Sequence, residues 1–200
     1  MILKNITEFN SELKKHKTMD TNLLNNYVLK AIDAYPYELE ETVENLNYAL
    51  SYESNNAYAL YLMGQLQAEQ LGDYEKAKHY FAEALANKMD FHKVYDKYIL
   101  VLIWNDDYQE AQNLIDFALT VKGIDKGLIW YYQGMLLEYQ TVYKKAIKAL
   151  KTAKAFGYNR DFISHIDNEI SRIKDKIKPK KKKASKKKKS KKDKKKKKKK

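Results

Sequence analysis

Histidines are the first residues to examine for chemistry in this chain, because imidazole titrates near neutral pH and binds metal ions. The four histidines are scattered, and none has a paired carboxylate at the spacing of a catalytic motif: His16, His79, His92 and His165. There is no cysteine, which excludes a cysteine nucleophile, a thiolate metal site and a disulfide framework. No glycine-rich loop follows a predicted strand, as phosphate binding would require. We therefore expect surface histidines, no enzyme activity, no cofactor and no metal site.

Lysines at the C-terminus offer a different chemistry, the binding of polyanions. Residues 178–200 contain 18 lysines and one aspartate, so this stretch carries +17 of a whole-chain net charge of +13 and residues 1–177 carry −4. Lysines that replace condensed counterions would bind nucleic acid without sequence preference, and anionic lipid would attract them too. The alternatives are a nuclear import or nucleolar signal, and a tolerated terminus that keeps the chain soluble. The expected polyanion-binding residues are Lys186, Lys187, Lys188, Lys189, Lys194, Lys195, Lys196 and Lys197.

The rest of the chain shows a repeat in which two small residues frame a bulky one. Ala77, Phe81 and Ala84 stand at i, i+4 and i+7, which places them on one face of a helix. The same frame recurs 34 and then 35 residues later, and a diverged copy precedes it by 35 residues. A period of this length predicts a stack of helical hairpins. The other copies are Ala111, Ile115 and Ala118; Ala146, Leu150 and Ala153; and Thr42, Leu46 and Ala49.

These residues resemble the tetratricopeptide repeat family, and the match extends into the first helix of each unit. Its positions are Leu60, Met63 and Gly64, then Tyr95, Tyr98 and Ile99, then Trp130, Gln133 and Gly134. The family places a small residue a turn after a large one so that the two helices of a hairpin approach closely. Ile99 departs from this rule, so we expect the middle hairpin to pack differently. The family's proline after the second helix is also missing, and Met89, Gly123 and Tyr158 replace it.

The resemblance implies an all-α fold, a right-handed α-solenoid, with the following organisation. Residues 1–19 form a short helix or cap, because Ile2, Ile6, Phe9 and Leu13 recur at helical spacing. A diverged hairpin at 20–56 precedes three repeats within 57–158. A capping helix follows at 159–178, and a disordered lysine-rich tail at 179–200. The repeats are 57–90, 91–124 and 125–158, and their internal turns are predicted at Gly72-Asp73, Asn105 to Asp107 and Gln140-Thr141.

A solenoid of this family has a concave surface lined by the first helix of each hairpin, and this surface is where partners are expected to bind. Aromatic side chains give a large contact area at low entropic cost. We therefore predict a groove for an extended or helical peptide segment of a partner protein. Several of its residues could instead fill space between repeats. The residues are Tyr27, Tyr61, Gln65, Leu100, Trp104, Tyr131, Met135 and Tyr139.

The composition of the chain limits the expectations for its location and function. No apolar run reaches the roughly 18 to 20 residues of a membrane span, and the N-terminus lacks the unbroken apolar core of a secretory peptide. We expect a cytoplasmic protein, or a nuclear or nucleolar one if the cell has a nucleus. The function that follows is a non-enzymatic adaptor for protein partners. The alternative is a protein associated with RNA or DNA mainly through its tail.

Overall fold

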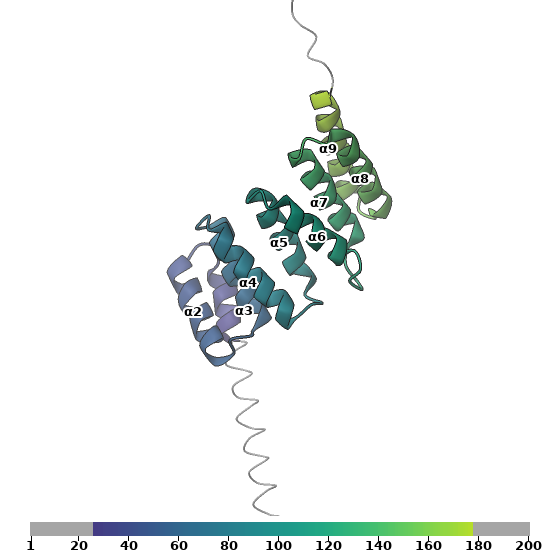
Figure 1. Ribbon diagram of the computed structural model, residues 1–200. Coiled ribbons are helices and arrows are strands. Elements are labelled where there is room, and N and C mark those ends of the chain that lie inside the picture. Colours follow the sequence, from purple (N-terminus) through teal and green to yellow (C-terminus); the bar gives the residue numbers. More distant parts are fainter. Residues whose placement is uncertain (1–25, 178–200) are drawn as a thin grey trace, which may run out of the picture.

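The computed structural model describes residues 26–177, and within that range every regular element is an α-helix (Figure 1). Residues 26–34 are helical and pair with α2 (Leu39–Tyr52). The elements that follow are α3 (Ala57–Glu69), α4 (Tyr74–Asn87), α5 (His92–Trp104), α6 (Tyr108–Ala118), α7 (Lys126–Tyr139), α8 (Tyr143–Phe156) and α9 (Arg160–Ile177). The predicted N-terminal cap, His16 and the lysine tail lie outside the described residues.

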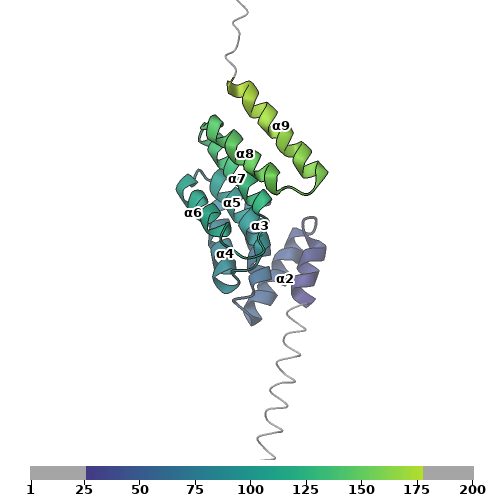
Figure 2. The same ribbon diagram turned by 90° about the vertical axis from the view of Figure 1, so that its right-hand side faces the viewer.

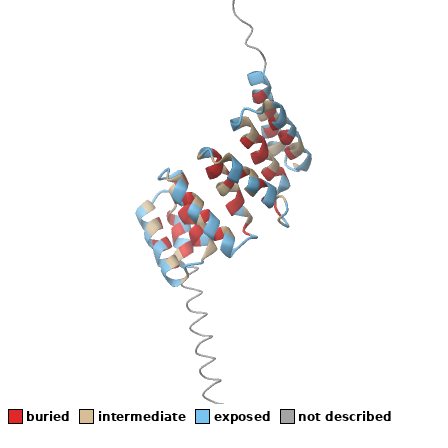
Figure 3. Ribbon diagram, viewed as in Figure 1, coloured by how far each residue is buried: buried red, intermediate tan, exposed pale blue. Residues whose placement is uncertain are grey.

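Successive helices pair into antiparallel hairpins, which stack so that α2 and α9 lie near opposite ends (Figures 1 and 2). The core runs along the stack between the helices of each pair (Figure 3). All four sets of framed residues lie in it, and each of their members is at most 2% exposed. Burial of the small-large-small faces is therefore confirmed, including that of the diverged copy in α2.

Two glycines allow the first and last of the clear hairpins to pack closely. A Cβ on Gly64 would lie 2.7 Å from the ring of Phe81, and one on Gly134 would lie 2.7 Å from the Leu150 side chain. Both distances are too short for any real side chain, so only glycine permits this approach. In the middle hairpin Ile99 is fully buried, and α5 packs less closely on α6 than α3 does on α4. The expected difference of the middle hairpin is confirmed.

Sharp reversals join the helices of each hairpin where the sequence predicts them. Gly72 adopts a φ of +66°, which glycine reaches without steric cost. Asp73 then caps α4, its side chain accepting the backbone N–H of Lys76 at 3.0 Å. At the two later turns Asp106 and Thr141 take φ values of 61° and 62°.

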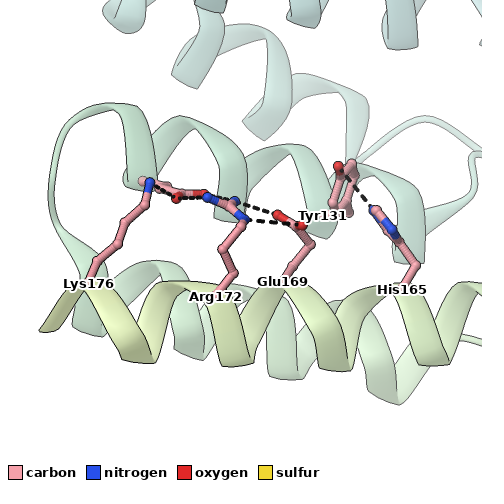
Figure 4. Close-up of polar contacts among 6 residues, drawn as sticks. Tyr131, His165, Glu169, Arg172 and Lys176 are labelled. Atoms are coloured by element: carbon pink, nitrogen blue, oxygen red, sulfur yellow. Dashed lines mark hydrogen bonds and ion pairs between the residues drawn. The ribbon is translucent and has the colours of Figure 1, made fainter. Parts of the chain in front are cut away.

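The last helix, α9, packs on α8 with one apolar face. Ile166, Ile170 and Ile173 on that face are buried, while most of the other residues of α9 are exposed. This is the arrangement that a terminal helix of a repeat stack requires. It also brings the charged flank of α9 beside the inner side of α7 (Figure 4).

Candidate binding cleft

The first helices of the three clear hairpins contact one another in order, α3 with α5 and α5 with α7. These three helices therefore form one row along the stack, which is called its inner side below. Beyond α7 no further hairpin follows in the described chain, and α9 takes the neighbouring place (Figure 4). Residues of α5, α7 and α9 then line a single cleft.

This cleft has a volume of about 380 Å³ and an apolar floor. Four of the residues predicted for the groove form the floor: Leu100, Trp104, Met135 and Tyr139. Trp104 is 41% exposed and Tyr139 is 50% exposed, so two large rings remain partly in water. Tyr74 of the preceding hairpin supports the indole of Trp104, with the ring centroids 6.0 Å apart. The floor therefore offers two partly exposed aromatic rings, and Tyr74 helps to hold one of them, the indole of Trp104, in place.

A charged wall borders the floor, and it consists of Glu138, Glu169, Arg172 and Lys176 (Figure 4). Arg172 donates to both oxygens of Glu138 at 2.6 Å and to Glu169 at 2.5 Å. Lys176 donates to Glu138 at 2.6 Å. Burial alone would raise the pKa of Glu138, but the hydrogen bonds from Arg172 and Lys176 outweigh it and hold the pKa below its ordinary 4.5. The wall is thus ionised and internally balanced.

Tyr131 lies on α7 beside His165 of α9 (Figure 4). The Tyr131 hydroxyl and His165 Nε2 are 3.3 Å apart, and the two rings meet edge to face at 5.3 Å. Burial, and then the negative charge of Glu169, raise the pKa of Tyr131. The ring is therefore held between α7 and α9, and less of it is available to a ligand than of Trp104 or Tyr139.

Three predicted groove residues lie away from this cleft. Tyr61 packs its ring 5.3 Å from that of Phe91, and burial raises its pKa to about 12. Gln65 donates to Glu69 at 3.2 Å. Tyr27 stacks on Tyr48 and Tyr52 of α2 at 5.3 and 6.5 Å. The structure therefore brings together four of the eight predicted residues, with Tyr131 nearby.

A second polar cluster lies between the first hairpins, around Glu69 at the end of α3. Its carboxylate accepts hydrogen bonds from Tyr35 at 2.7 Å and from Lys97 at 2.5 Å. Next to Lys97, Asp96 is largely desolvated; burial first, and then the charge of Asp125, raise its pKa to about 6. Burial therefore favours the protonated form of this carboxyl group.

Glu138, Glu169, Arg172 and Lys176 were not singled out from the sequence. A signal for three of them exists, since Glu169, Arg172 and Lys176 follow one another at three and four residues along α9, beside its isoleucine stripe. That spacing marks one flank of a helix. The sequence does not show that this flank meets Glu138, because the meeting depends on how α9 crosses α7.

Of the histidines within residues 26–177, His79 is exposed and pairs with Glu83, while His92 Nε2 lies 3.1 Å from the carbonyl oxygen of Lys122. Among the described residues no group of three or more His, Asp or Glu side chains is placed to hold a metal ion. In the same part of the chain no helix has both the length and the apolarity that crossing a membrane demands.

No protein-family model matches the chain, and no curated protein matches it in sequence. Two solved structures are similar. One is a "MamA RS-1 ArsTM double mutant", with a TM-score of 0.58 and 16% identity over 80% of this chain and 97% of that one. The other is MamA from residue 41 to its end, from Desulfovibrio magneticus RS-1, with a TM-score of 0.56 and 18% identity over 78% of this chain and 94% of that one. MamA is all-helical and tetratricopeptide-like, so the similarity shows that this chain has an all-helical, tetratricopeptide-like fold.

Proposed function

We propose that the chain is a non-enzymatic interaction scaffold that holds a segment of a partner protein in the cleft between α5, α7 and α9. One observation carries this proposal: Trp104 and Tyr139 remain 41% and 50% exposed in a cleft of about 380 Å³. Exposed rings in a hollow give a partner a large area to bury, and such residues dominate binding energy at protein interfaces. The tetratricopeptide-like fold supports the same reading, since stacked hairpins present extended concave surfaces.

The cleft also favours a particular kind of segment. Its volume lies at the lower end of ligand sites, so it suits one or two side chains of a peptide rather than a whole folded element. Leu100 and Met135 make the floor apolar, and the wall already neutralises its own charges. An apolar or aromatic anchor residue fits this floor. Flanking polar groups of the peptide would then lie against Arg172, whose side chain is 46% exposed.

The test is affinity capture with the full chain, followed by measurement of each captured partner with variants. We expect Trp104→Ala and Tyr139→Ala each to weaken binding at least tenfold, which corresponds to about 1.4 kcal/mol. Phe156→Ala is the matched control, because Phe156 is 48% exposed but lies outside the cleft. Circular dichroism establishes that the variants are folded. Unchanged binding in a folded Trp104→Ala/Tyr139→Ala double variant would refute the assignment of the cleft.

A second function is favoured by a separate observation, the 18 lysines within residues 178–200. We propose that this segment attaches the scaffold to nucleic acid through charge alone. The segment has no aromatic residue and no arginine, so neither base stacking nor bidentate base readout contributes. The affinity for nucleic acid should therefore not depend on its base sequence. It should fall steeply as the salt concentration rises, because the release of counterions then contributes less free energy.

Binding of RNA to the full chain and to a version ending at residue 178 tests this second function. Between 50 and 200 mM salt we expect the affinity of the full chain to fall by about a thousandfold or more. The shortened version should show no measurable binding. Trp104→Ala should leave RNA binding unchanged, which separates the tail from the cleft. RNA binding that persists after removal of the tail would exclude this role for the lysines.

A further inference from the structure

Asp96 of α5 lies next to the cleft but is not one of the residues that line it. The cleft residues Leu100 and Trp104 follow it at four and eight residues, so the three side chains lie on one face of α5. At 1.5 Å per residue, Leu100 is about 6 Å and Trp104 about 12 Å from Asp96 along the helix. A segment that lies on the floor of the cleft and runs along α5 therefore reaches Asp96.

Two tyrosines flank Asp96, one on each neighbouring helix of the inner side. Tyr61 of α3 precedes Asp96 by 35 residues, so the two occupy equivalent positions in successive hairpins. Tyr132 lies on α7, which contacts α5. Burial, and then the charges of Glu69 and Asp96, raise the pKa of Tyr61, while burial, and then the charge of Asp96, raise the pKa of Tyr132. Both hydroxyl groups therefore lie close enough to feel the charge of this carboxylate.

These three polar groups have no partner within the chain. Across residues 26–177 the side chains of Asp96, Tyr61 and Tyr132 form no hydrogen bond. For Tyr132 this is unusual, because only 7% of the residue is exposed and buried polar groups are ordinarily bonded. Its hydroxyl oxygen reaches the surface, since the one fully enclosed side-chain polar atom without a partner in the described chain is the amide oxygen of Gln67. The three groups are therefore available to a ligand.

The charge beside these groups is negative. Asp125, which caps α7, acts on Asp96 from the next hairpin. Lys97 and His92 also act on Asp96, but Lys97 donates to Glu69 at 2.5 Å and His92 Nε2 lies against a backbone carbonyl oxygen. In the part of the chain that the structure describes, neither Asp96 nor Asp125 forms an ion pair. A cation from outside the chain would balance these carboxylates, and it would favour the ionised form of Asp96, which burial opposes.

We infer that Asp96, Tyr61 and Tyr132 form a subsite for a lysine or arginine side chain of the segment held in the cleft. This inference rests on the proposed function and adds the chemistry of the partner. A carboxylate binds an ammonium or guanidinium group through charge-assisted hydrogen bonds, and each tyrosine hydroxyl can accept a further one. An extended segment covers roughly 3.3 to 3.6 Å per residue, so the basic residue stands about two to four positions from the apolar anchor.

Selection from a display library of random peptides tests the subsite in the full chain. Peptides that are enriched equally on a Trp104→Ala/Tyr139→Ala variant bind outside the cleft, at the lysine tail for example, and are discarded. In the remaining peptides we expect lysine or arginine, two to four residues from an apolar or aromatic residue, at about five times its frequency in the library. Selection on Asp96→Asn should lose this basic preference and keep the anchor. Asp116→Asn removes an exposed charge on α6 and is the matched control, which should select the same peptides as the natural chain.

The most enriched peptide then allows a double-mutant cycle. We expect Asp96→Asn, or glutamine in place of the basic residue of the peptide, each to weaken binding about tenfold, and the two together to weaken it no further. Tyr132→Phe keeps the ring and removes the hydroxyl, so it should weaken the basic peptide several-fold and leave the glutamine peptide unaffected. Circular dichroism establishes that each variant is folded.

The outcomes separate this inference from the proposed function. Enriched peptides that have the anchor but no basic preference would overturn the subsite and leave the cleft assignment standing. Equal losses for the basic and glutamine peptides in Asp96→Asn would also overturn it, because the variant would then act on the fold and not on the cation. A selection that yields no peptide dependent on Trp104 and Tyr139 would refute the cleft and the subsite together.

Discussion

Arg172 of α9 meets Glu138 of α7 through two parallel hydrogen bonds, Nη1 to Oε1 and Nη2 to Oε2, each 2.6 Å long. Lys176 contacts the same carboxylate, whose side chain is only 9% exposed. Bidentate pairing of this kind is among the stronger polar contacts in proteins. Glu138 therefore ties the terminal helix to the inner side of the last hairpin.

Replacing Glu138 with glutamine should loosen α9. Glu138→Gln removes the charge that both cations share, and we expect the free energy of unfolding to fall by about 1 to 2 kcal/mol. Urea denaturation at pH 7 measures this change. Glu169→Gln is the control and should cost less, because the ion pair found for Glu169 is with Arg172 alone. An equal loss in the two variants would contradict the central role of Glu138.

The same contact has a defined pH dependence. The pKa of Glu138 is lower in the folded chain than its ordinary value of 4.5, so the unfolded chain binds the proton more tightly. Its stabilising contribution is complete above pH 4.5 and is lost as the pH falls through the lower folded pKa. The difference in stability between the natural chain and Glu138→Gln should therefore shrink below pH 4.5. A difference that stays constant down to pH 3 would argue against an ionised Glu138.

Asp96 should show the opposite behaviour. Burial and Asp125 raise its pKa from 3.8 to about 6, so the folded chain binds the proton more tightly than the unfolded chain. Above pH 6 the buried charge opposes folding, and this cost fades as the pH falls from 6 towards 3.8. We expect Asp96→Asn to stabilise the chain by about 1 to 2 kcal/mol at pH 7 and to have little effect at pH 4. Asp116→Asn, an exposed change on α6, is the matched control.

Gly134 should tolerate no side chain despite its position within a helix. Alanine is the better helix former by about 1 kcal/mol, yet its Cβ would lie 2.7 Å from Leu150. We expect Gly134→Ala to lower the free energy of unfolding by about 1 to 3 kcal/mol, because α7 and α8 must move apart. Gly127→Ala is the control: the backbone and Cβ atoms that its new methyl would meet are 3.5 Å away, and only the Asp125 side chain is closer, at 3.1 Å. Thermal unfolding of both variants measures the difference, and a stabilised Gly134→Ala would refute close packing here.

The amides of Gln112 and Gln133 form a reciprocal pair with two bonds of 2.8 Å, and Gln133 is 7% exposed. Gln112→Ala should cost about 1 to 3 kcal/mol, because it leaves a buried amide without this partner. Adding Gln133→Leu should recover part of the loss, since the buried position then holds an apolar group. A double-mutant cycle measures the coupling between the two residues. Additive losses would show that the pair does not join α6 to α7.

Sequence periodicity was sufficient to predict the helices and their buried faces, because Ala77, Ala111 and Ala146 repeat at a spacing that only a helical stack explains. It also marked Ile99 as an exception, since one large residue replaces a small one at a known contact. Periodicity does not predict how each helix is rotated relative to its neighbours. That rotation depends on many weak contacts spread over the chain, so the separation of Tyr27 and Tyr61 from Trp104 could not be read from spacing alone.

The charged wall shows the same limit. Glu138 and Arg172 are 34 residues apart, and each has nearer partners of opposite charge in the sequence. Which pair forms is decided by the crossing of α9 over α7, and that crossing is set by the isoleucines that pack on α8. The apolar packing of α9 therefore determines which ion pairs form, and the composition of the chain alone does not predict them.

Ile99 also has a consequence for the spacing of the stack. Because its side chain stands where Gly64 and Gly134 leave space for a partner helix, α5 and α6 approach one another less closely than the pairs on either side. A smaller residue at this position would let the two helices draw together. Since α5 also borders the cleft, Leu100 and Trp104 would shift with it, so one buried side chain outside the cleft helps to set the cleft's width.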